Sequence, residues 1–185
     1  VLPAVGWVWL WMLGPALTAP FLNLYFNRRL ELEAPQVGLL FAAANLLWGG
    51  IVFLSGDAAS RVGRARLLML SLVFFAPATW GLSAAASLGV AVSLFLLQGA
   101  VSPMANPLID QLLLERVEPA RHGLVSSWRQ AAADLSAMAG ASLGGKLLAA
   151  EGFTPLMAAA GGAGLAGAVG LVLALRKPAR LAVSR

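Results

Sequence analysis

A few carboxylate, amide and guanidinium side chains lie inside long apolar runs of this sequence, and these are the residues that could do chemistry. The most unusual is Asp134, which lies about 16 Å along a helix that would begin near Gly123. An isolated charge at that depth in an apolar segment is costly, so we expect Asp134 to exchange a proton or to meet a cationic solute. Gln130 lies four residues earlier and shares its helix face.

Other polar residues of this kind are spread over four of the apolar runs. They are Asn23, Asn45, Gln98, Asn106, Asp110 and Arg129. Asn106 and Asp110 are four residues apart and share a helix face, and two prolines beside them predict a kink. Asp110 is near a helix end, where it could pair with Arg116 or Arg129. Taken singly, Asn23, Asn45 and Gln111 each have an equal alternative as a hydrogen-bonding contact between helices, worth about 1 kcal/mol.

The composition of the chain makes a membrane its natural solvent. Of its 185 residues, 59% are apolar and only 11% are charged, against roughly 25% in a soluble protein. The absence of cysteine and the single histidine exclude disulfides, thiolate sites and two-histidine metal sites. We expect no metal, no cofactor and no enzyme activity, because His122 lies in a predicted loop and is no partner for a nucleophile inside the membrane.

Six apolar runs are long enough to cross about 30 Å of hydrocarbon as helices, which takes roughly 20 residues each. They cover about 3–26, 35–56, 67–84, 90–114, 123–150 and 154–175. Loops are predicted at 57–66 and 115–122. The expected fold is all-α and polytopic, a six-helix transmembrane bundle over 1–175 with a basic cytoplasmic tail at 176–185. The third and sixth helices lack the polar residues, so we expect them to lie outside the other four, against lipid.

Lysine and arginine are distributed unevenly over the two predicted sides of the membrane. Nine lie on one side, namely Arg61, Arg64, Arg66, Arg116, Arg121, Arg176, Lys177, Arg180 and Arg185, and three on the other, namely Arg28, Arg29 and Lys146. Because cytoplasmic loops retain positive charge, both termini are predicted to be cytoplasmic, in the cell (inner) membrane. The net charge of +5 is then a topology signal, and no nucleic-acid partner is expected.

Small residues and tryptophans give further expectations about packing. Two sets of small residues at spacing four predict close helix contacts, namely Ser136, Gly140 and Gly144 in the fifth helix and Gly162, Ala166 and Gly170 in the sixth. The tryptophans at 7, 9 and 11 are expected to anchor at the cytoplasmic interface or to contact lipid. The chain begins with valine, and its first apolar run is too long for a signal peptide, so we expect a piece of a longer protein.

A short basic segment between the second and third helices contains Gly56, Arg61, Gly63 and Arg64. It resembles the signature loop of the major facilitator superfamily. That signature is Gly, then Asp four residues later, followed by Arg, any residue, Gly and Arg. Its counterparts here are Gly56, Arg61, Gly63 and Arg64. Ser60 stands at the Asp position, although the neighbouring Asp57 could substitute for it. Such degeneration is typical of the second copy of the loop, in the carboxyl half of these transporters.

Other stretches agree with this resemblance in their order and spacing, namely 20–26, 36–40, 118–123 and the small-residue run to Gly145. Together they resemble the carboxyl-terminal six-helix half of a bacterial multidrug-type or sugar-type facilitator. The resemblance implies a secondary active transporter that moves a small solute by alternating access, often coupled to protons, with a missing amino-terminal six-helix half as partner. The alternative is a six-helix membrane interaction or accessory protein without transport activity.

Overall fold

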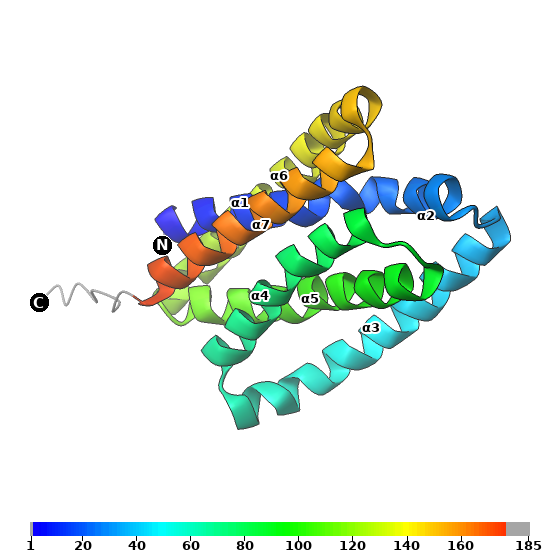
Figure 1. Cartoon of the computed structure of the whole chain (residues 1–185). Helices are drawn as coiled ribbons and strands as arrows, with labels where there is room; N and C mark the ends of the chain where they lie inside the picture. Colours follow the sequence, from blue (N-terminus) through cyan, green and yellow to red (C-terminus); the bar gives the residue numbers. More distant parts are fainter. Residues whose placement is uncertain (1, 177–185) are drawn as a thin grey trace, which may run out of the picture.

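The structure, a computed structural model, describes residues 2–176, and the regular elements over that range are all helical (Figure 1). In chain order they are α1 (Leu2–Thr18), the 3-10 helix η1 (Ala19–Phe21), α2 (Leu22–Leu30), α3 (Ala34–Val62), α4 (Arg64–Ala84), α5 (Leu88–Leu114), the 3-10 helix η2 (Pro119–Arg121), α6 (His122–Glu151) and α7 (Phe153–Arg176). The predicted all-α fold is confirmed. The predicted basic tail lies, beyond Arg176, outside the described residues.

Within residues 2–176, five helical segments are long and apolar enough to cross a membrane. They are Pro3–Leu30, Ala34–Leu54, Arg66–Ala84, Leu88–Leu114 and Phe153–Leu175. The predicted fifth helix, α6, is not among them, because charged residues such as Arg129, Asp134 and Lys146 lower its mean hydropathy. With 30 residues α6 is nevertheless about 45 Å long, which suffices to span a bilayer. It packs along α1 as part of the same bundle.

The first span is interrupted rather than continuous. α1 ends at Thr18, η1 follows, and α2 resumes at Leu22. The interruption contains Pro20, which lacks the N–H needed to continue the helical hydrogen bonds. The span then runs four residues further than the predicted end at residue 26 and stops before Glu31, whose backbone adopts a left-handed φ of 55°.

The predicted loop at 57–66 is wrong, because nearly all of this segment is helical. α3 continues to Val62 and α4 begins at Arg64, so the chain turns at the single residue Gly63. Gly63 has a φ of 93°, a conformation that glycine adopts without steric cost. Charged residues lower hydropathy without breaking a helix, so the apolar run ends before the helix does.

The six long segments pack unevenly. α1 packs mainly against α6 and α7, and α4 mainly against α5 and α7, whereas α3 lies mainly along α5 (Figure 1). Within their spans, 50% of α7 and 47% of α4 are buried by the rest of the chain, against 11% of α3. α4 and α7, which the sequence placed outside the others, are thus the most enclosed helices.

Close helix contacts occur at glycines, as the small-residue pattern predicts for α6. An added methyl group at Gly140 or Gly144 would overlap the α1 backbone, at Ala16 and Leu17 respectively. The pattern predicted for α7 is confirmed at one of its three residues. Gly170 is buried against the ring of Trp7 in α1, whereas Gly162 and Ala166 are exposed. A further close contact occurs at Gly167, which lies against the α1 backbone at Trp11. Spacing alone identified the close contact but not the face that makes it.

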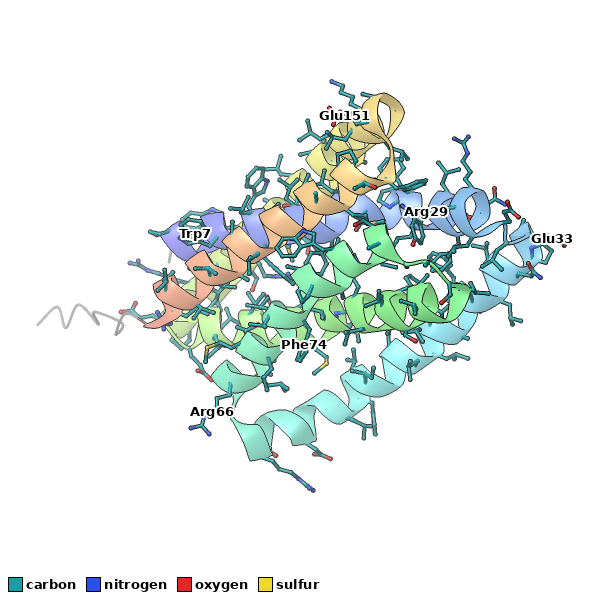
Figure 2. The ribbon with its side chains drawn as sticks, viewed as in Figure 1. Trp7, Arg29, Glu33, Arg66, Phe74 and Glu151 are labelled. Carbon is teal, nitrogen blue, oxygen red and sulfur yellow. The ribbon has the colours of Figure 1, made fainter. Side chains whose placement is uncertain are left out.

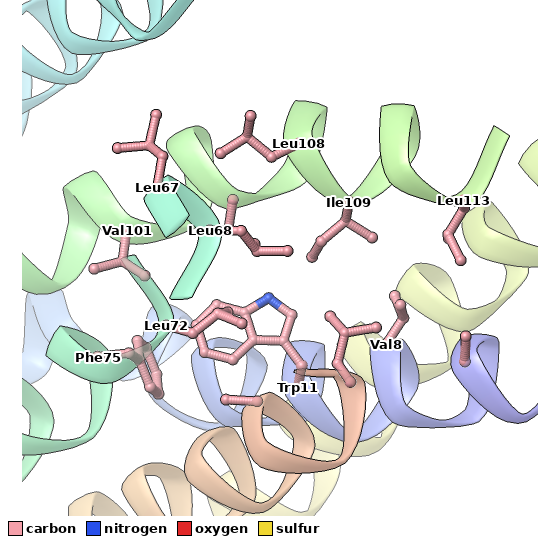
Figure 3. Close-up of a cluster of buried hydrophobic side chains, with 14 of the residues drawn as sticks. Val8, Trp11, Leu67, Leu68, Leu72, Phe75, Val101, Leu108, Ile109 and Leu113 are labelled. Carbon is pink, nitrogen blue, oxygen red and sulfur yellow. The ribbon is translucent and has the colours of Figure 1, made fainter. Parts of the chain in front are cut away.

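Trp11 lies in the core, which corrects the expectation that it anchors at the membrane interface. It is 1% exposed, and its ring meets that of Phe75 edge-on, with the centroids 5.1 Å apart. Apolar side chains of α1, α4 and α5 surround it (Figure 3), including Val8, Leu68, Leu72, Phe75, Ile109 and Leu113. This cluster joins the α1 and α7 side of the bundle to the α4 and α5 side.

Basic residues gather toward one end of the bundle. The start of α1, the α3–α4 turn, the α5–α6 connection and the end of α7 lie at that end, and the remaining connections lie at the other (Figure 1). Figure 2 shows Arg66 at the first end, and Arg29, Glu33 and Glu151 toward the second. The nine-to-three charge split was counted with this assignment of ends, and three of the nine, Lys177, Arg180 and Arg185, lie outside the described residues.

Candidate functional site

Two of the predicted polar residues form an ion pair between neighbouring helices. Nε of Arg129 in α6 lies 2.6 Å from Oδ1 of Asp110 in α5, and both side chains are partly exposed. Of the two partners open to Asp110, the structure thus selects Arg129. Arg116 instead donates hydrogen bonds to the carbonyls of Ala174 and Leu175 in the last turn of α7.

Replacing Arg129 with glutamine is expected to lower the free energy of unfolding by about 2 kcal/mol, between the values for exposed and for fully buried pairs. The physical reason is the half-buried Asp110 carboxylate, which would lose its cation. Thermal unfolding of the detergent-solubilised protein measures this loss. The double variant Asp110→Asn with Arg129→Gln is the control and should recover most of it, because neither charge remains. A double variant no more stable than the single one would contradict this account.

Gln130 and Asp134 form a second polar pair within α6. Nε2 of Gln130 donates to Oδ1 of Asp134 at 2.9 Å, and both residues are exposed. Asp134 lies about 18 Å from the start of α6 at His122, near the middle of this helix. The predicted shared face is therefore confirmed. The arrangement leaves a carboxylate held by a neutral amide and open to a proton or a cation.

The three asparagines predicted to face a polar path differ in their surroundings. Asn23 in α2 and Asn45 in α3 are exposed, and Asn106 in α5 is half-buried. Nδ2 of Asn45 donates to the carbonyl of Phe41, one turn earlier in the same helix. Within residues 2–176, neither Asn23 nor Asn45 hydrogen-bonds to another helix. The alternative role as interhelical contacts therefore finds no support at these two positions inside this chain.

Gln98 is separated from the exposed polar residues because it points into the chain. It is 4% exposed, and its Nε2 donates to Oγ1 of Thr79 at 3.0 Å and to Oγ1 of Thr18 at 3.4 Å. These bonds join α5 to α4 and to the end of α1. No sequence pattern groups these three residues, since threonine is tolerated in apolar helices by bonding to its own backbone, as Thr79 does to Phe75.

The segment that resembles the signature loop forms the end of α3, the Gly63 turn and the start of α4. Asp57 and Arg61 are exposed at the end of α3. The hydroxyl of Ser60 donates to the backbone carbonyl of Asp57 at 2.7 Å, so it bonds within its own helix. The side-chain surroundings of Gly56 and Arg64 lie outside what the structure describes.

The long apolar helices, the basic residues near one end and the exposed polar side chains at mid-helix together define a polytopic integral membrane protein. The chain belongs to the Major Facilitator Superfamily, whose family model matches residues 8–185. No curated protein matches the chain. The family assignment made from the basic segment is thus confirmed, and the family is one of solute transporters rather than enzymes.

Proposed function

We propose that this chain is the carboxyl-terminal half of a secondary active transporter, which moves a small solute by alternating access together with an amino-terminal six-helix half. One observation carries the proposal: Gln130 and Asp134 are exposed near the middle of α6. Contact between hydrocarbon and a carboxylate or an amide costs free energy, so we expect polar protein groups or water to cover this face of α6. The family membership makes a second set of helices around a solute path the natural cover.

In the proposed mechanism, the polar residues have different roles, which follow from their chemistry. Asp134 takes up a proton or meets a cationic group, and Gln130 holds its carboxylate in place. Asn23, Asn45 and Asn106 offer amide donors and acceptors to the hydroxyl, amide or amine groups of a small solute. The Asp110–Arg129 pair links α5 to α6, so that the polar face of the two helices moves as one unit.

The proposed setting is the cell (inner) membrane with both termini in the cytoplasm, as the nine-to-three split of basic residues indicates. The proposed partners are the lipid bilayer, the amino-terminal half, the solute and protons, with no nucleic acid and no cofactor. Single cysteines at the exposed positions Ser60 and Ala86, which lie at opposite ends of the bundle, test this orientation. An impermeant thiol reagent added to intact cells should label Ala86→Cys only, and labelling of Ser60→Cys instead would reverse the orientation.

Reconstituted alone as a monomer, the 185-residue chain is expected not to transport, because its polar face has no partner that could close a path. Liposomes with an imposed proton gradient measure this, with ethidium as a cationic probe and glucose as a neutral one. Empty liposomes give the background, and the chain reconstituted together with an amino-terminal half is expected to rise above it. Uptake of either probe by the monomeric chain alone would refute the half-transporter proposal.

A further inference from the structure

Helix α3 carries Asn45 but is loosely held within the chain. Only 11% of its span is buried, against 35% for α5, along which it lies. Its contacts come from one side, where Ala44 is fully buried and the ring of Phe41 meets that of Phe95 in α5 at 5.0 Å. A helix with so few contacts needs a specific anchor if Asn45 is to keep a fixed position.

Trp48 provides such an anchor on α5. Its Nε1 donates to the carbonyl of Leu96 at 3.0 Å, and its ring meets Phe95 edge-on at 5.2 Å. The indole also lies over Gly99, three residues after Leu96, where an added methyl group would overlap the ring. The indole N–H requires a partner when it is removed from water. The hydrogen bond and the glycine contact together constrain both the axial position of α3 and its rotation relative to α5.

The same arrangement occurs a second time in the chain, between α4 and α7. Nε1 of Trp80 donates to the carbonyl of Ala158 at 3.3 Å, and the ring lies against Gly161, three residues further on. None of the polar residues assigned to the proposed path lies on α4 or α7. This second pair therefore serves as a matched control, with equal local chemistry away from the proposed path.

We propose that Trp48 and Gly99 are positioning residues, which hold α3 on α5 so that Asn45 faces the solute path. The inference rests on the proposed function, because it assumes an aqueous path along this face. Asn45 lies three residues before Trp48, about 60° away around the helix, so a shift at Trp48 moves Asn45 directly. Neither positioning residue needs to touch the solute.

The test compares two single-cysteine variants of this chain, which has no native cysteine, each assembled with a cysteine-free amino-terminal half as the complete transporter. One carries Asn45→Cys, and the other carries Leu46→Cys, about 100° further around α3, where the native side chain is 81% exposed. The readout is the ratio of their reaction rates with a water-soluble thiol reagent in native membranes, from both sides. A ratio separates repositioning from unfolding, because unfolding raises both rates.

Position 45 is expected to react faster than position 46, because it faces water while position 46 faces lipid. Adding Gly99→Ala pushes the ring away, and adding Trp48→Phe removes the donor. Each is expected to lower the ratio about fivefold, which corresponds to one lost neutral hydrogen bond of about 1 kcal/mol. Gly161→Ala, the matched control, should leave the ratio unchanged.

The outcomes separate this inference from the function on which it rests. A high ratio in the parent pair that stays unchanged with both Gly99→Ala and Trp48→Phe overturns the positioning role alone. A ratio near one in the parent pair removes the aqueous path, and with it both the proposed function and this inference. A fall with Gly99→Ala and Trp48→Phe but not with Gly161→Ala supports the inference.

Discussion

Replacing Asp134 with asparagine is expected to abolish gradient-driven transport while the protein still folds. The substitution keeps the size of the side chain and removes its charge and its exchangeable proton. Asp134 is exposed near the middle of α6 and accepts a hydrogen bond from a neutral amide, so the loss of its charge should lower the stability only slightly. We expect uptake to fall about a hundredfold, the lower limit of what a positioned proton-transfer group contributes.

Uptake and expression of the Asp134→Asn protein must be measured together, in the complete transporter. Exchange of solute across the membrane without a gradient can survive, since no net proton movement is needed for it. Glu151→Gln, an exposed carboxylate at the end of α6, is the control and should transport normally. Unchanged uptake by Asp134→Asn at normal expression would remove Asp134 from the mechanism.

Gly140→Leu is expected to prevent stable folding. A side chain at this position would overlap the backbone of Ala16 in α1, and backbone cannot move aside as a flexible side chain can. The free energy of unfolding should fall by more than about 3 kcal/mol, which is the upper end of the usual range for overpacked cores. The yield of monodisperse protein in detergent and its thermal unfolding measure the effect.

Gly162→Leu is the matched control for this prediction. Gly162 is also a helix glycine predicted from spacing to pack closely, but it is exposed and has open space where a side chain would be added. We expect it to give a normal yield. Equal yields of the two leucine variants would show that α6 does not approach α1 as closely as the structure has it.

The helical spans were predictable because lipid imposes a length on every apolar run. Their ends and interruptions were less so, because they depend on backbone conformation. The break at η1 follows from Pro20, yet the chain tolerates Pro77, Pro103 and Pro107 inside continuous helices. Proline marks a place where a helix could break, and the packing of its neighbours decides whether it does.

The candidate site shows the same division between what spacing predicts and what packing decides. Residues in one helix were paired correctly from their spacing, as Gln130 with Asp134. Contacts between helices needed the structure. The choice of Arg129 as partner for Asp110 depends on how α5 and α6 lie together, and the burial of Gln98 depends on two threonines from other helices. A single sequence contains no signal for the relative rotation of two apolar helices.

The most direct test of the half-transporter account is the labelling of a single cysteine at Gln130 from each side of the membrane in the complete transporter. Gln130 lies beside Asp134 on the exposed face of α6, and Val169 on α7, which is 52% exposed and apolar, is the lipid-facing reference. Alternating access predicts that an impermeant thiol reagent reaches Gln130→Cys from either side, and Val169→Cys from neither. If the reagent labels Gln130→Cys from neither side, as expected for Val169→Cys, the result would contradict the account and favour an accessory membrane protein.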